Sequence, residues 1–210
     1  MLVLAAGCTD SDGDDQVVDD AAVTTAATDA TSTSSSTSTS SPGTTAATTT
    51  SVAPTPTTAP FDGATDEVRR ERPATTTEVV AHTGLEVTTG AGEERIAFTF
   101  DGALPGVVVE YVERPVREAG SGDEVAVDGD AVLQIRLEPA SSARVDGEEV
   151  VRTYAGPDRV PGTGGTVAEV VRIGDFEALY EWVAGVGSET PFRVEVSDAE
   201  DSVTVVLPAG

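Results

Sequence analysis

Lysine is absent from this chain of 210 residues, and histidine, cysteine, tryptophan and methionine each occur once. With no lysine and no second histidine, most pairings of a nucleophile with a general base are excluded, so we expect a protein that is not an enzyme. Carboxylate pairs remain, but acidic residues are so abundant that the sequence singles out none of them. The lone histidine, His82, is expected to make a structural polar contact, and no cofactor or metal ion is predicted.

Basic residues are also few: 12 Lys+Arg face 37 Asp+Glu, which gives a net charge of −25. Such a surface repels the phosphate backbone of nucleic acids, which excludes them as partners. It also repels anionic lipid headgroups, so attachment to a membrane must be hydrophobic or covalent. No stretch after residue 8 is apolar and long enough to cross a bilayer. We interpret the acidic surface as solubilising rather than as a binding face.

Aromatic and large aliphatic residues are almost missing from residues 9–60, which consist mainly of Thr, Ser, Ala, Asp and Pro. Such a segment cannot bury enough apolar surface to offset the entropy lost on ordering. We therefore predict a disordered Ser/Thr/Ala/Pro-rich linker over residues 9–74, which ends in a hinge or a short frayed helix. A single folded domain is predicted over residues 75–210, a length at which a domain buries roughly two-thirds of its unfolded surface.

The single cysteine, Cys8, stands directly before this linker. A lone cysteine is a core residue, a reactive thiol or a modified residue. The polar linker that follows argues against a core position, and the lack of a neighbouring histidine or metal ligand argues against a reactive thiol. Modification of the thiol is the interpretation that remains.

The residues Leu4-Ala5-Ala6-Gly7-Cys8 resemble the lipobox of bacterial lipoprotein signal peptides. The resemblance implies that residues 1–8 are the end of a signal, that cleavage occurs before Cys8, and that its thiol carries a lipid. Cys8 would then anchor the protein at the extracytoplasmic face of the cell membrane, stably so with two or three acyl chains. A signal needs a basic region and about 7–15 apolar residues, so we expect the true start of the protein to lie upstream of Met1.

Apolar and polar residues alternate along short runs after residue 75, which is the pattern of half-buried strands. The runs are TEVVAH (77–82), RIAFTF (95–100), VVVEYVE (107–113), AVLQIRLE (131–138), AEVVRI (168–173), PFRVEVS (191–197) and SVTVVL (202–207). Turn residues separate them at the spacing of a sandwich, and Asp128-Gly129 is the strongest predicted hairpin turn, between VAV and AVLQIRL. The predicted fold class is all-β, an antiparallel β-sandwich.

One segment, GDFEALYEWVAGVG (174–187), fits two kinds of secondary structure over Phe176 to Gly185. Phe176, Leu179, Tyr180 and Val183 have helical spacing, whereas Tyr180, Trp182 and Ala184 alternate as in a strand. We favour the strand, which would form a hairpin with PFRVEV through residues 187–190.

These stretches, in their order, resemble the AMIN-like domain of actinobacterial lipoproteins. The matching stretches are RIAFTF, PGVVVEYVERPV, AGSGDEVAVDGDAVLQIRLEPA, YAGPDRVPG, EVVRIGDFEALYEWVAGV and PFRVEV, within about residues 76–207. TGLEVTTGAGEE (83–94) is expected to be a loop, longer than is usual in the family. The resemblance implies a β-sandwich that binds peptidoglycan without catalysis. The alternative is a protein-interaction module that recruits or regulates an envelope enzyme or complex.

Five residues are candidates for contact with a ligand such as a wall glycan. Trp182, Tyr180 and Tyr154 would form an aromatic surface for the C–H face of a sugar, and Arg159 or Arg172 would meet a carboxylate. Core packing is the alternative for Trp182 and Tyr180, and it is the one we favour. Tyr154 and Arg159 lie in a loop-rich stretch and are expected to be more exposed.

Overall fold

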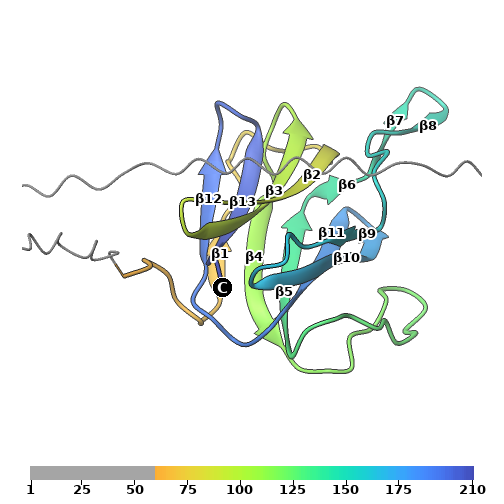
Figure 1. Cartoon of the computed structure of the whole chain (residues 1–210). Coiled ribbons are helices and arrows are strands. Elements are labelled where there is room, and N and C mark those ends of the chain that lie inside the picture. Colours follow the sequence, from red (N-terminus) through yellow and green to blue (C-terminus); the bar gives the residue numbers. More distant parts are fainter. Residues whose placement is uncertain (1–59) are drawn as a thin grey trace, which may run out of the picture. The chain divides into compact units, whose positions relative to one another are not determined.

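The computed structural model describes residues 60–210, and two β-sheets pack face to face in it (Figure 1). The strands are β1 (Val68–Arg70), β2 (Val80–Gly90), β3 (Glu93–Asp101), β4 (Gly106–Val112), β5 (Ala131–Glu138), β6 (Ala140–Ser141), β7 (Ala143–Asp146), β8 (Glu149–Arg152), β9 (Arg159–Pro161), β10 (Val167–Phe176), β11 (Leu179–Val186), β12 (Arg193–Ser197) and β13 (Ser202–Pro208). The six-stranded sheet has the order β1-β4-β5-β11-β10-β9, the five-stranded sheet β12-β13-β3-β2-β6, and β7 pairs with β8 alone. Neighbouring strands are antiparallel except β2 and β6. The predicted antiparallel β-sandwich is confirmed.

The main core lies between the two sheets and is formed by alternate residues of the strands. The predicted inward residues that are buried there are Ile96, Phe98, Phe100, Val107, Val109, Leu133, Ile135, Leu137, Phe192, Val194, Val203, Val205 and Leu207. Two further predicted inward residues differ, since Tyr111 is only half-buried and Val196 is exposed. Alternation therefore predicts the buried face of most strands, because a half-buried strand places every second side chain inward.

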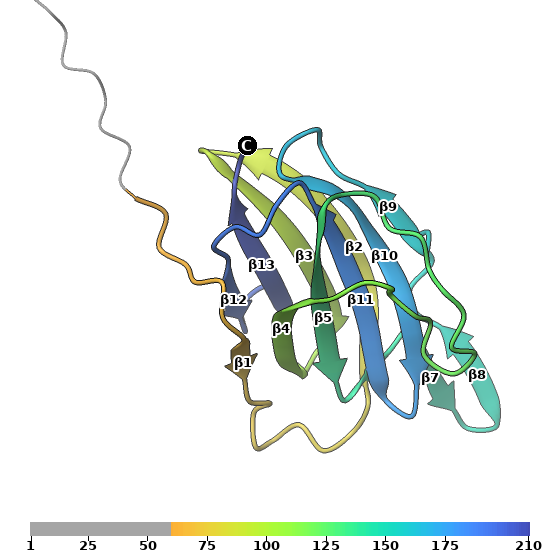
Figure 2. The same cartoon turned by 90° about the horizontal axis from the view of Figure 1, so that it is seen from below.

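The ambiguous segment 174–187 is extended and not helical, as favoured, but it contains the end of β10, a turn and β11, and its hairpin partner differs from the predicted one. β11 pairs with β10 and β5, which run beside it in Figure 2, and not with β12. The turn between β10 and β11 is Glu177-Ala178, with φ angles of 51° and 65°. Positive φ at both central residues suits the right-handed twist of a hairpin, but such turns usually contain Gly or Asn. The predicted hairpin through residues 187–190 is wrong, because that segment crosses to the other sheet.

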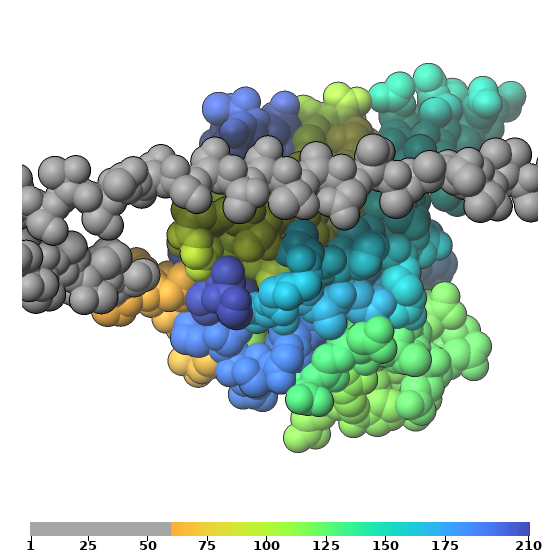
Figure 3. All heavy atoms as spheres, in the orientation of Figure 1, coloured from red at the N-terminus to blue at the C-terminus, as the bar shows by residue number. Residues whose placement is uncertain are grey.

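A long loop, residues 113–130, covers part of the outer face of the six-stranded sheet and is visible at the surface in Figure 3. Its predicted VAV strand (125–127) and the hairpin at Asp128-Gly129 are wrong, because the loop packs on the sheet instead of pairing with β5. The loop and the outer face of the six-stranded sheet form a second apolar cluster, which consists of Val116, Val127, Val132, Val171, Ile173 and Val183.

Strand β2 is longer than the sequence predicts. The expected loop 83–94 is wrong, since β2 continues to Gly90 and turns into β3 only at Ala91-Gly92. Leu85 and Val87 alternate with polar residues and pack at the margin of the core. Thr and Glu residues fill the outward positions of β2. The composition of β2 is therefore typical of a loop, although its alternation of apolar and polar residues is that of a strand.

The folded part also begins earlier than the predicted boundary at residue 75. β1 pairs with β4, and Val68 packs against the core. Ala64 exchanges two backbone hydrogen bonds with Phe192, at 3.0 and 2.8 Å. The end of the predicted linker 9–74 thus belongs to the sandwich, because an edge position of the sheet gives it hydrogen-bonding partners. The rest of that linker, the predicted signal 1–8 and Cys8 lie outside the described residues.

Gly185 on β11 provides a test of how the loop 113–130 is held. An added Cβ there would lie 1.7 Å from the carbonyl oxygen of Asp128, whereas one on Gly187 would have nothing within 4 Å. We expect Gly185→Ala to lower the free energy of unfolding by roughly 2 kcal/mol or more, because the loop must move off the sheet. Gly187→Ala is the matched control, and urea unfolding of the whole chain measures both. Equal stabilities for the two variants would contradict this account of the loop.

Candidate functional site

Three of the predicted contact residues lie in the core. Tyr154, Tyr180 and Trp182 are 3%, 0% and 0% exposed. Their rings surround His82, at centroid distances of 4.5, 5.0 and 6.2 Å respectively. Tyr154 was expected to be exposed and is not, because its segment folds back so that the Tyr154 hydroxyl donates to the carbonyl of Pro157 at 3.0 Å. A ring that stacks on a sugar must be accessible, so these three form no such surface in this structure.

His82 is completely buried at the centre of this aromatic cluster. Its Nδ1 lies 3.0 Å from the Tyr180 hydroxyl, and its Nε2 has no hydrogen-bond partner among the described residues. Burial disfavours the imidazolium and lowers the pKa of His82 to about 4. The ring is therefore neutral at physiological pH, and its contact with Tyr180 is a structural one within the core.

The two predicted arginines hold loops in place. Arg159 is half-exposed and forms an ion pair with the buried Glu169, and it donates to the carbonyl of Ala126 at 2.9 Å. It thereby ties the loop 113–130 to the β9 edge of the sheet. Arg172 is largely buried, pairs with Asp158 at 2.6 Å and donates to the Ser142 hydroxyl at 3.1 Å. Of the five residues in the prediction, only Arg159 has a side chain that is half-exposed.

A hollow of about 360 Å³ lies where the loop 113–130 meets the end of β10. Phe176, which is 66% exposed, lines it together with Arg172, Glu118, Asp158 and Asp175, although Oδ2 of Asp175 already accepts a hydrogen bond from the backbone nitrogen of Ser142. An accessible aromatic ring beside hydrogen-bond acceptors can pack on the C–H face of a sugar while the carboxylates accept hydrogen bonds from its hydroxyl groups. We call this site the Phe176 hollow.

The sequence gives little signal for the Phe176 hollow. Phe176 fits the helical spacing and appears there as a core residue, and its exposure depends on the turn at Glu177-Ala178. That turn contains no glycine or asparagine, which are the residues that mark positive φ in a sequence. Only the observed pairing of Phe176 with Leu179 reveals that the ring stands at a hairpin tip.

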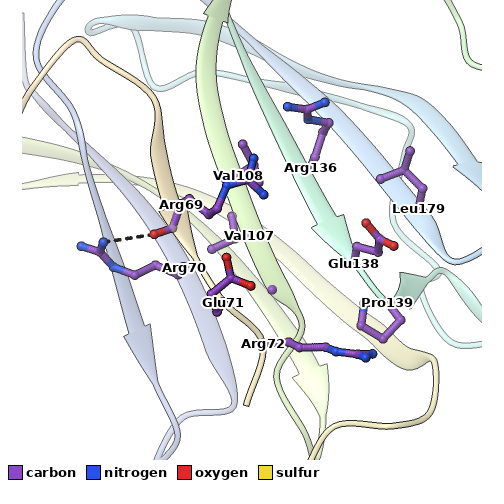
Figure 4. A pocket seen from close by; sticks show the side chains of 11 residues that line it. Arg69, Arg70, Glu71, Arg72, Val107, Val108, Arg136, Glu138, Pro139 and Leu179 are labelled. Atoms are coloured by element: carbon purple, nitrogen blue, oxygen red, sulfur yellow. Dashed lines mark hydrogen bonds between the residues drawn. The ribbon is translucent and has the colours of Figure 1, made fainter. Parts of the chain in front are cut away.

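A second hollow of about 400 Å³ is open on the outer face of the six-stranded sheet, beyond the reach of the loop 113–130. Its charged lining residues are Arg69, Arg70, Glu71 and Arg72 from β1 and the segment after it, and Arg136 and Glu138 from β5. Figure 4 shows Arg70 directed away from the others, toward the carbonyl oxygen of Arg69 at 3.3 Å. We call this site the arginine groove. It gathers basic residues on an otherwise acidic chain.

Two further properties of residues 60–210 bear on function. No group of three or more His, Cys, Asp or Glu side chains in this part of the chain is placed to hold a metal ion. The same residues include no helix long and apolar enough to cross a membrane. The Phe176 hollow and the arginine groove are the candidate binding sites in this part of the chain.

The burial of His82 predicts a pH dependence of stability. Its pKa is about 4 in the folded protein and about 6.5 when unfolded, so the unfolded state binds more protons between these values. Stability is full above pH 6.5 and falls as the pH is lowered toward 4, by about 3 kcal/mol over that range. Chemical unfolding at pH 7 and pH 5 measures the fall. In His82→Phe the free energy of unfolding should change less with pH above pH 5. An unchanged dependence on pH would contradict its assignment to His82.

Comparison with protein families matches residues 80–207 to the AMIN-like domain. Comparison with curated proteins and with solved structures gives no match. The matched range runs from the start of β2 into β13 and includes the aromatic cluster and the Phe176 hollow, whereas β1 precedes it. More than half of the chain thus matches one family, and the chain belongs to the AMIN-like domain family.

Proposed function

We propose that the protein is a non-catalytic envelope lipoprotein whose AMIN-like domain binds the peptidoglycan of the cell wall. The observation that carries the proposal is the family match over residues 80–207, since AMIN-like domains are a kind associated with cell-wall binding. The lipobox-like residues before Cys8 support a lipid anchor on that cysteine, at the extracytoplasmic face of the membrane. The polar residues between Cys8 and the sandwich would then serve as a spacer.

The Phe176 hollow is the place we propose for contact with the glycan strand. The ring of Phe176 offers an apolar platform, and Asp158 and Glu118 offer acceptors for sugar hydroxyl groups. Arg172 holds Asp158 in position through their 2.6 Å ion pair. A neutral sugar is not repelled by a chain with a net charge of −25, so this contact would persist at high salt.

The proposal is tested by co-sedimentation of the 210-residue chain with purified sacculi across a salt series. We expect retention that survives salt, and about fivefold weaker retention for Phe176→Ala, because the change removes the stacking ring. The free energy of unfolding of Phe176→Ala should differ from that of the original chain by less than about 0.5 kcal/mol, since Phe176 is 66% exposed. Phe176→Tyr, which keeps an aromatic ring, is the matched control and should bind as the original chain does. Absence of retention on sacculi would refute the proposed function.

A second candidate function, a module that recruits or regulates an envelope protein, is favoured by the β7–β8 ribbon. This ribbon extends beyond the two sheets in Figure 1. Val145 and Val150 face each other across it and are 74% and 71% exposed. Two exposed valines on one face of an isolated ribbon offer an apolar contact to another protein. If sacculi do not retain the chain, this ribbon is the first surface to examine.

A further inference from the structure

The arginine groove is built from two parts of the chain that are distant in sequence. Gly106 allows them to approach, since an added Cβ would lie only 3.1 Å from the backbone nitrogen of Arg72 and 3.2 Å from the carbonyl oxygen of Glu138. Arg69 pairs with Val108, and Val108 with Arg136, so these three side chains share the outer face of the sheet. The groove therefore rests on fixed strand pairing.

The charges in the groove divide into a paired and an unpaired set. Arg136 forms an ion pair with Glu110, and Arg69 lies 3.4 Å from Glu67. Within residues 60–210, the exposed side chains of Arg70 and Glu71 have no ion-pair partner, and the same holds for Arg72 and Glu138. Figure 4 shows Arg72 and Glu138 at the same end of the groove, beside Pro139. Opposite charges that line one hollow without neutralising each other are available to a ligand.

This pattern has a specific chemical complement. A guanidinium binds a carboxylate through paired N–H donors, and a carboxylate binds an ammonium group. A ligand with only a negative charge would be attracted by Arg72 but repelled by Glu138. A ligand with only a positive charge would be attracted by Glu138 but repelled by Arg72. A ligand that carries both an ammonium and a carboxylate group satisfies both side chains.

The groove also has a defined position relative to the Phe176 hollow. Arg136 on β5 is opposite Glu181 on β11, and Glu181 is opposite Gly174 on β10, which lines the hollow. Strands are about 4.8 Å apart, so the backbone of Arg136 in the groove and that of Gly174 in the hollow lie about 10 Å apart on one sheet. One polymer with a sugar part and a peptide part would reach both sites.

We propose that the arginine groove binds a zwitterionic peptide, with Arg72 on its carboxylate and Glu138 on its ammonium group. The groove lies partly outside the range matched to the family, because Arg69 and Arg72 precede residue 80. The source of the peptide, the peptide part of the wall polymer, rests on the proposed function. The zwitterionic chemistry does not depend on it.

The experiment titrates three forms of tri-alanine into the isotope-labelled 210-residue chain and follows backbone amide shifts by NMR. The free tripeptide carries both charges, its N-acetylated form only the carboxylate, and its C-terminal amide only the ammonium group. We expect shifts at residues that line the groove, and an affinity for the free tripeptide about threefold higher than for either blocked form. Equal affinity for all three forms, or no shifts at the groove, would overturn the proposal.

Two substitutions separate the zwitterion from simpler ligands. Arg72→Gln and Glu138→Gln should each weaken binding of the free tripeptide about threefold, and neither disturbs an ion pair among the described residues. Arg152→Gln, at an exposed arginine on β8 away from the groove, is the matched control and should have no effect. If the groove were a site for anions only, Glu138→Gln would bind the free tripeptide more tightly than the original chain does. If it were a site for cations only, Arg72→Gln would bind the free tripeptide more tightly. Either result would overturn the proposal.

Co-sedimentation with sacculi distinguishes this proposal from the proposed function. Retention on sacculi without tripeptide binding at the groove would refute the peptide site and leave wall binding intact. Tripeptide binding at the groove without retention on sacculi would support the peptide site and refute the wall as its source. If both hold, free tri-alanine should reduce retention on sacculi, and the N-acetylated form should do so less.

Discussion

Strand β11 is buried on both faces, and the rest of the sandwich depends on this constraint. Tyr180, Trp182 and Ala184 face the core between the sheets, whereas Val183 faces the second apolar cluster. Gly185 faces the carbonyl of Asp128, so the loop 113–130 can lie directly on the strand. A strand in this position must be largely apolar and small where the loop approaches, and its one charged residue, Glu181, accepts a hydrogen bond from Gln134 at 3.2 Å. The aromatic cluster around His82 and the placement of the long loop both follow from it.

The same constraint explains which parts of the fold could be predicted from the sequence. Strands β3 and β5 alternate because one of their faces is largely free of the core, and Phe98 and Ile135 are inward as predicted. Strand β11 shows two spacings at once, because both of its faces are covered and Glu181 is its one charged residue. A segment as apolar as this fits a buried helix as well as a buried strand. The loop 113–130 is wrongly predicted to contain a strand. Its apolar residue Val127 packs on the outer face of the six-stranded sheet and does not pair with a strand.

The candidate site was less predictable because it depends on which rings the fold leaves exposed. Composition identifies the aromatic residues but not their exposure: Trp182 is fully buried, as favoured from the sequence, whereas the exposure of Phe176 has no signal in the sequence. The ring of Tyr154 packs against His82 and Trp182, which lie on β2 and β11 in different sheets, so this contact exists only once the two sheets have packed together. The arginine groove is likewise invisible in sequence, since Arg72 and Arg136 are brought together by the pairing of β1, β4 and β5.

The outer faces of the two sheets use their few basic residues differently, and this difference favours the six-stranded sheet as the binding face. On the five-stranded sheet, Arg193 lies 2.9 Å from Glu93 and 2.8 Å from Glu195, and Arg95 pairs with both carboxylates. These ion pairs cover Val206, which is fully buried between the two arginines, and leave little charge available to a ligand. On the six-stranded sheet the loop covers only one part of the face, and the groove and the Phe176 hollow stay open on either side of β11. In a chain with so strong a negative charge, opposite charges left unpaired in one hollow are better explained by a ligand that carries both signs than by solubility, for which acidic residues alone suffice.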